Sequence, residues 1–124
     1  MNNKNIDIHS RQEDVSPFYN KASVVVNLSD KEKFIETFGM TALESMSAGV
    51  PIIVPTEGGI AEMVDGQNGY KIDVQDLHKI EDAIRCILSD KVMYMKMSGS
   101  ALVKSKEYDI DAMISKIEKI LYNV

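Results

Sequence analysis

The stretch ETFGMTALESMSAGVP, residues 36–51, contains two glutamates that flank a glycine, followed by a run of small and apolar residues. Within this run, apolar residues recur at i, i+3 and i+7, at Leu43, Met46 and Val50. This spacing predicts a helix from Gly39 to Gly49. Glu36 would then lie in the loop before the helix and Glu44 one turn inside it. What these carboxylates can do depends on the fold around the helix.

Two runs of branched apolar residues enclose this predicted helix. SVVVNLS at 23–29 and PIIVPT at 51–56 lack the alternation of apolar and polar residues that is typical of a strand with one solvent-exposed face. Each therefore predicts a strand that is buried on both faces of a parallel sheet. Shorter strands are predicted at 5–10, NIDIHS, and at 69–74, GYKIDV.

The remaining segments have helical patterns. A short helix is predicted at 14–22, another within 57–69, and longer ones at 76–90, 91–107 and 109–124. The apolar stripe of 76–90 consists of Leu77, Ile80, Ile84, Ile87 and Leu88, and that of 109–124 of Ile110, Met113, Ile114, Ile117, Ile120 and Leu121. Asp76 is a plausible N-cap. Strands that alternate with helices predict an α/β fold with a parallel sheet, flanking helices and a helical C-terminal part at 91–124.

Composition limits the classes of protein that the chain can belong to. Its 124 residues suit a single domain, 1–124, and 44% hydrophobic residues suffice for a core. A net charge of -5 argues against nucleic-acid binding. The polar N-terminus lacks the apolar segment of a signal peptide, no apolar run approaches a membrane span, and Cys86 is the single cysteine. These features predict a soluble protein of the cytoplasm.

The start of the helix at 39–49 has the chemistry of an anion site. In sheets of this type, ligands bind beyond the carboxyl ends of the strands, and strand 23–29 ends shortly before this helix. The free backbone N–H groups of about Gly39, Met40 and Thr41 would favour a phosphate there. A carboxylate at Glu44 would repel the phosphate but could accept hydrogen bonds from a vicinal diol such as a ribose. Spacing alone leaves an alternative open, in which Glu36 caps the helix and Glu44 is a solvated surface residue.

The longer stretch ETFGMTALESMSAGVPIIVPTEGGIAEMVDGQNGYKID resembles the nucleotide-sugar signature of the group 1 (family 4) glycosyltransferases of GT-B fold. In that signature, two glutamates separated by seven residues precede a small-residue helix that ends in "GvP", then "GG", "E" and "dG.nG" follow. The corresponding residues here are Glu36, Glu44, Gly49-Val50-Pro51, Gly58-Gly59, Glu62, Asp65-Gly66 and Asn68-Gly69. The resemblance covers roughly residues 14–90, in order and with correct spacing.

The resemblance implies a role for each matching residue. Glu36 would be catalytic, near the sugar or the leaving phosphate. Backbone N–H groups of Gly39, Met40 and Thr41 would bind the diphosphate of a donor such as a UDP- or GDP-sugar, and Glu44 would bind its ribose. Gly58 and Gly59 would shape the loop under the nucleotide. Members of the family transfer a sugar with retention of configuration and generally need neither a metal nor another cofactor, because the helix dipole and basic side chains stabilise the leaving diphosphate.

The sequence also departs from this family. The N-terminal domain that binds a sugar or lipid-linked acceptor has no counterpart, nor do the first two strands of the donor domain. We therefore expect a partial Rossmann-like sheet in which segment 5–10 either pairs directly with 23–29 or is displaced, which would leave 23–29 near a sheet edge. We also expect the chain to be the donor-binding part of an enzyme of polysaccharide or glycoconjugate synthesis, inactive alone. The full enzyme would be cytoplasmic, peripheral to the inner face of the membrane. The alternatives are a non-catalytic subunit, or a folded remnant that self-associates as a homo-oligomer.

Other polar and sulfur-containing residues are better explained by structure than by chemistry. Asp109 and Asp111 form an Asp-x-Asp pair, but they start a predicted helix and suit its cap and first turn. His9 and His78 are isolated, and no cluster has metal-ligand spacing. Cys86 is predicted to pack in the apolar helix. Three alternate methionines of 91–107 are predicted to pack in the core or against another domain: Met93, Met95 and Met97.

Overall fold

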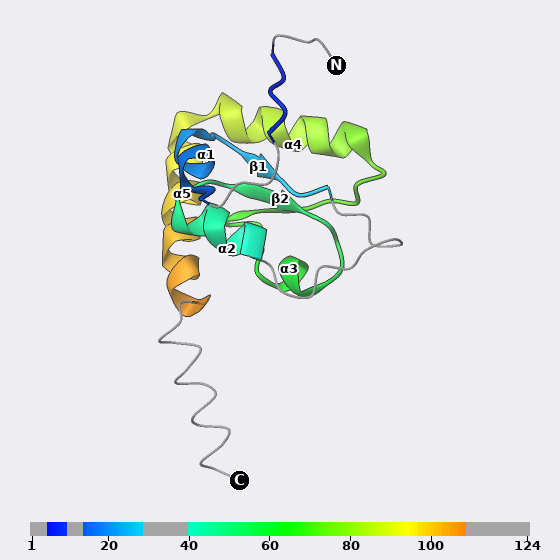
Figure 1. Cartoon of the computed structure of the whole chain (residues 1–124). Helices are drawn as coiled ribbons and strands as arrows, with labels where there is room; N and C mark the ends of the chain where they lie inside the picture. Colours follow the sequence, from blue (N-terminus) through cyan, green and yellow to red (C-terminus); the bar gives the residue numbers. More distant parts are fainter. Residues whose placement is uncertain (1–4, 10–13, 29–39, 109–124) are drawn as a thin grey trace.

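A computed structural model describes residues 5–9, 14–28 and 40–108 (Figure 1). Within these residues, three strands form a parallel sheet in the order β1-β2-β3, with bounds Val25–Val26, Ile52–Val54 and Gly69–Lys71. Val25 pairs with Ile52, and Ile52 pairs in turn with Gly69. The predicted α/β class and parallel sheet are thus confirmed. The strands are shorter than the predicted runs at 23–29, 51–56 and 69–74.

Helices cover both faces of this sheet (Figure 1). In chain order they are α1, Ser16–Lys21; α2, Met40–Ser47; α3, Gly59–Glu62; α4, Leu77–Ser89; α5, Lys91–Ser105; and the short 3-10 helix η1, Lys106–Tyr108. On one face, Ile52 and Val54 of β2 pack with residues of α2 and α3. On the other, Ile53 packs with Ile80 and Ile87 of α4. α5 joins both clusters, because Ala101 belongs to the first and Met97 to the second.

Strand 5–10 was predicted wrongly. Residues 5–9 are not in a strand and do not pair with β1, so of the two expected alternatives the direct pairing does not occur. Within the described ranges, β1 is an edge strand, as the displaced alternative required. Its valines are half-buried, with Val25 against one core cluster and Val26 against the other. A β-strand exists only as part of a sheet, because its backbone hydrogen bonds are made to a neighbouring strand.

The apolar stripe predicted for α4 is only partly buried. Asp76 caps the helix as predicted, since its carboxylate accepts a hydrogen bond from the Lys79 backbone N–H at 3.2 Å. Ile80 and Ile87 are buried, but Leu77 and Leu88 are 69% and 54% exposed. Cys86 is exposed, so the prediction that it packs in the core is wrong.

The methionines of α5 also differ from the prediction of core packing. Met97 is buried, whereas Met93 and Met95 are 48% and 61% exposed. A contact with another domain stays a prediction for these two. The helix predicted at 109–124, including Asp109 and Asp111, lies outside the described residues.

A left-handed glycine ends α2 and directs the chain into β2. Gly49 has φ +71°, and the Gly49 and Val50 N–H groups donate to the carbonyl oxygens of Met46 and Ser45. These two bonds form a Schellman motif, which satisfies carbonyl groups at the helix end. The buried Ser45 hydroxyl donates to the Val50 carbonyl oxygen at 2.8 Å. Because this end of α2 lies next to the start of β2, the first turn of α2 points toward the opposite, carboxyl edge of the sheet.

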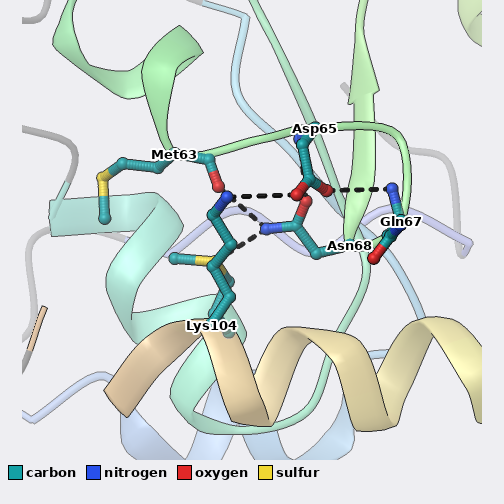
Figure 2. Close-up of polar contacts among 6 residues, drawn as sticks. Met63, Asp65, Gln67, Asn68 and Lys104 are labelled. Atoms are coloured by element: carbon teal, nitrogen blue, oxygen red, sulfur yellow. Dashed lines mark hydrogen bonds and ion pairs between the residues drawn. The ribbon is translucent and has the colours of Figure 1, made fainter. Parts of the chain in front are cut away.

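The turn between α3 and β3 is held by one buried amide, that of Asn68 (Figure 2). Its Nδ2 donates to the Met63 carbonyl oxygen at 2.9 Å and to the Met46 sulfur at 2.9 Å. Its Oδ1 accepts from the Asp65 backbone N–H at 3.0 Å. The Asn68 carbonyl oxygen accepts from the Ile52 N–H, so the same residue also begins the pairing of β3 with β2.

The Asp65 carboxylate connects this turn to α5 (Figure 2). It accepts a hydrogen bond from the Gln67 backbone N–H at 3.0 Å and forms an ion pair with the Lys104 Nζ at 3.1 Å. The Gln67 N–H is the larger cause of a lowered Asp65 pKa, Lys104 adds to it, and partial burial opposes both. The same ion pair raises the pKa of Lys104.

We expect Gly69→Ala to destabilise the fold by about 3 kcal/mol or more. A Cβ at this position would lie 1.9 Å from the Ile52 carbonyl oxygen, so β3 would have to move away from β2. Urea unfolding followed by circular dichroism measures the change. The matched control is Gly66→Ala, where φ is +83° but a Cβ meets nothing within 4 Å; backbone strain alone should cost about 1 kcal/mol there. Equal costs for the two variants would contradict the close approach.

We expect Asn68→Leu to lower the free energy of unfolding by about 2–4 kcal/mol, because the Met63 carbonyl and the Asp65 N–H would both lose their partner. The same urea titration serves as the measurement. Gln67→Leu is the control, since it keeps the backbone N–H that bonds to Asp65. An Asn68→Leu protein as stable as the Gln67→Leu protein would show that the amide does not hold the turn.

The lowered Asp65 pKa predicts a pH dependence of stability. The folded protein binds this proton more weakly than the unfolded chain, whose value is 3.8. The contribution is therefore present above about pH 4 and is lost as the pH falls through the folded pKa. Asp65→Asn should remove this part of the decline in urea midpoint between about pH 5 and pH 3. Lys104→Met should keep most of it, because the Gln67 N–H remains; a decline that is unchanged in Asp65→Asn would contradict the assignment.

Candidate functional site

Two helices begin beyond the carboxyl ends of neighbouring strands. α2 precedes β2 closely and runs back along the sheet, so its first residues, Met40 and Thr41, lie toward the carboxyl edge. α3 begins at Gly59, shortly after β2 ends at Val54. α2 and α3 are in contact with each other. Four of the predicted site residues thus lie on elements that begin at one edge of the sheet: Met40, Thr41, Gly58 and Gly59.

Gly58 supplies the backbone conformation that the start of α3 requires. It is the residue before the helix and has φ +99°, which side-chain-bearing residues rarely adopt. Its carbonyl oxygen accepts from the Ala61 N–H at 3.1 Å and so opens the helix. The sharp turn at Gly58 lets the chain pass from β2 into α3 through a short loop, and α3 then lies next to α2.

Glu44 lies one turn inside α2 and is half-buried. Its side chain lines a groove of about 460 Å³ between α1 and α2. α1 contributes Ser16, Tyr19 and Asn20 to the wall, and α2 contributes Leu43 and Ser47 as well as Glu44. The structure therefore places the predicted carboxylate in a recess rather than on a flat surface. A volume of this size lies within the range of small-molecule sites.

The lining of this groove suits a neutral polar group. The described residues around it are Asp14, Val15, Ser16, Tyr19, Asn20, Leu43, Glu44, Ser47 and Ala48; among these are two carboxylates and no basic side chain. A phosphate inside the groove would be repelled by Glu44. Hydroxyl and ring N–H groups could instead donate to the Glu44 carboxylate or exchange hydrogen bonds with Asn20 and the serines. Any phosphate has to lie outside the groove, toward the free N–H groups at the start of α2.

The groove wall formed by α1 was missed in the sequence. Ser16, Tyr19 and Asn20 form no recognisable pattern in the sequence. Their approach to Glu44 depends on how α1 packs against α2. Only a tertiary contact brings them to the site. Asp14 fixes the start of α1, since its Oδ1 accepts from the Ser16 backbone N–H at 3.0 Å.

Glu36 and Gly39 lie outside the described residues, so the roles predicted for them stay predictions. Among residues 5–9, 14–28 and 40–108, no group of three His, Cys, Asp or Glu side chains could hold a metal ion. His9 lies edge-on to the ring of Phe18 with centroids 4.7 Å apart, and His78 is exposed. No helix in the described part of the chain is long and apolar enough to cross a membrane.

Residues 1–90 match the family model described as "Glycosyl transferases group 1". The chain belongs to this family. One relative is the sucrose-phosphate synthase of Spinacia oleracea, 32% identical over 95 residues, which are 76% of this chain and 9% of that protein. Another is the N-acetyl-alpha-D-glucosaminyl L-malate synthase of Bacillus anthracis, 30% identical over 129 residues, with 98% of this chain and 33% of that protein covered. The chain thus spans a third or less of the length of these relatives.

Solved structures agree with this assignment. The C-terminal domain of the group 1 glycosyltransferase LpcC from Francisella tularensis matches with a TM-score of 0.70 and 25% identity, over 85% of this chain and 53% of that one. Anabaena HepE, solved in complex with UDP, matches with a TM-score of 0.75 and 23% identity, over 91% of this chain and 31% of that one. The fold is therefore that of a GT-B C-terminal domain, as the sequence predicted.

Proposed function

We propose that the chain binds the nucleotide part of a nucleotide-sugar donor and serves a retaining glycosyltransferase as its donor-binding part. The observation that carries this proposal is the position of Glu44. It is half-buried in a groove, one turn from the start of a helix that begins toward the carboxyl edge of a parallel sheet. A carboxylate that can accept hydrogen bonds from a diol and a helix start that can bind a phosphate therefore lie one turn apart on the same helix.

The proposed binding mode separates the charges of the ligand. The diphosphate lies at the first turn of α2, where the N–H groups of Met40 and Thr41 and the helix dipole favour negative charge. The ribose hydroxyls donate to the Glu44 carboxylate in the groove, whose described lining residues include no basic side chain to compete for it. Gly58 and Gly59, at the start of α3, carry no side chain that could obstruct the ligand.

Catalysis requires more than these residues. Glu36 would act near the sugar or the leaving phosphate, and a sugar or lipid-linked acceptor would be bound by another domain. We infer that the full enzyme takes part in polysaccharide or glycoconjugate synthesis and that the chain alone does not transfer sugar. Membership of a glycosyltransferase family supports sugar transfer by the full enzyme, and two relatives are a sucrose-phosphate synthase and an N-acetyl-alpha-D-glucosaminyl L-malate synthase.

We expect one nucleoside diphosphate among UDP, GDP and ADP to bind the chain in a calorimetric titration. UDP is the first choice, because the HepE structure of the same fold holds it. Glu44→Ala should weaken binding by about 10- to 100-fold, the loss expected for hydrogen bonds to a charged group. Glu44→Gln keeps the size of the side chain and tests the charge.

Glu81→Ala is the matched control for this titration. Glu81 is exposed on α4, where it pairs with Arg85 at 2.7 Å, and α4 covers the face of the sheet opposite to α2. Its loss should leave the affinity unchanged. Equal binding by Glu44→Ala and the unaltered chain, or no binding of any of the three nucleotides by folded protein, would contradict the proposed site.

A further inference from the structure

α5 has two apolar faces, and only one of them is buried. Met97 and Ala101 lie on the buried face, in the two core clusters. The opposite face is centred on Gly99, and four apolar side chains lie within about 60° of this glycine around the helix axis. They are between 43% and 66% exposed: Val92, Met95, Leu102 and Val103. The described part of the chain therefore leaves this second face largely uncovered.

Gly99 lies at the centre of the exposed face, where the fold of the single chain does not require a glycine. A Cβ added to it would meet nothing within 4 Å, and its φ is not positive. A glycine inside a helix destabilises the helix relative to alanine. Beside it runs an open groove of about 590 Å³, which Met95 and Val103 also line. The absence of a side chain lets the backbone of another helix approach α5 closely.

The residues on either side of Gly99 complement one another as two antiparallel copies of α5 require. When two copies cross at Gly99 about a two-fold axis, each residue before it meets the residue at the same separation after it. Met95 then meets Val103, each four residues from Gly99. Lys91 meets Glu107, each eight residues away, so opposite charges face each other at both ends. These positions form one row at i, i+4 spacing, the ridge that interlocks in the commonest class of helix packing.

The other lysines near this face also have compatible partners. Two further pairs result from the same two-fold axis: Lys96 with Leu102, and Lys106 with Val92. The aliphatic part of each lysine then covers an apolar side chain, while its ammonium group stays in water. Lys104 is already paired with Asp65 of its own chain at 3.1 Å. On this face of the described helix, the two-fold arrangement therefore brings no like charges into register.

We propose that this face of α5 binds the same face of a second copy of the chain, antiparallel and centred on Gly99. Both its apolar and its charged residues complement themselves under a two-fold rotation, which identifies a second copy as the partner rather than an unrelated helix. The face is separate from the groove beside Glu44, which lies between α1 and α2. The inference therefore does not rest on the proposed function.

Charge reversal tests the register of the two copies. In sedimentation equilibrium of the full chain at low ionic strength, Lys91→Glu and Glu107→Lys should each weaken dimerisation about five- to tenfold, because each places like charges at both ends of the interface. The double variant restores opposite charges and should recover the affinity of the unaltered chain. Lys79→Glu is the matched control, since it changes the net charge equally but lies exposed on α4. A double variant that dimerises no more tightly than either single variant would overturn the pairing.

Cross-linking tests the same register without relying on charge. In a Cys86→Ser background, Met95→Cys combined with Val103→Cys supplies thiols that meet only between two copies, because within one helix they are about 12 Å apart. Mild oxidation should give a covalent dimer on non-reducing electrophoresis, at least about tenfold faster for this pair than for either single variant. Equal rates for the pair and the single variants would contradict an antiparallel contact centred on Gly99.

Gly99→Gln separates pairing from folding. Its side chain blocks the crossing point, whereas its Cβ meets nothing within its own chain. Dimerisation should therefore weaken at least about tenfold, while the urea midpoint, measured at a concentration where the chain is monomeric, should not fall. A lowered midpoint would show that Gly99 serves the single chain and would count against the proposal. A dimer that Gly99→Gln leaves intact, or an unaltered chain that stays monomeric up to about 1 mM, would overturn it.

Discussion

The buried amide of Asn68 is the interaction on which the arrangement of the sheet and its helices depends. Its side chain holds the turn after α3 closed and contacts α2 through Met46, while its carbonyl oxygen begins the pairing of β3 with β2. Gly69 follows at once, with its backbone against the Ile52 carbonyl. A polar side chain that is fully buried is costly unless its hydrogen bonds are made, and here both its donor and its acceptor atoms have partners. The position of β3 is therefore tightly specified.

The position of the candidate site follows from this arrangement. Because β2 is fixed between its two neighbours, the helices that precede and follow it in the chain are fixed at its two ends. After α2 the chain turns at Gly49 and enters β2. The first turn of α2 and Glu44 therefore lie toward the opposite edge of the sheet, where α3 begins. The groove beside Glu44 exists because α1 packs on the same helix. A short sheet with tightly closed turns thus positions a polar recess and a helix start side by side.

Sequence reasoning predicted the features that depend on local pattern. The branched runs at β1 and β2, the N-cap at Asp76 and the helices at 77–89 and 91–105 were found because periodicity and capping are local. The strand predicted at 5–10 was wrong over residues 5–9, since a strand also requires a neighbour and these residues do not pair with the edge strand β1. Leu77 and Met95 are apolar but exposed, because a periodic stripe does not reveal how much of it another element covers. At the candidate site, Glu44 was found from the motif, whereas Tyr19 and Asn20 depended on a tertiary contact.

The strand order β1-β2-β3 is the same as the order of these strands along the chain. Each strand therefore lies beside the one that precedes it in the chain, and each pairing closes only the crossover connection between consecutive strands, which keeps the entropic cost of closure below that of joining more distant segments. Topologies dominated by such nearby pairings fold faster than those that join distant segments. During synthesis, β1 and α2 emerge before β2, which can join them before β3 and α4 have left the ribosome. α5 follows all three strands in the chain and contacts both core clusters, so the residues that close the core are made last among these elements.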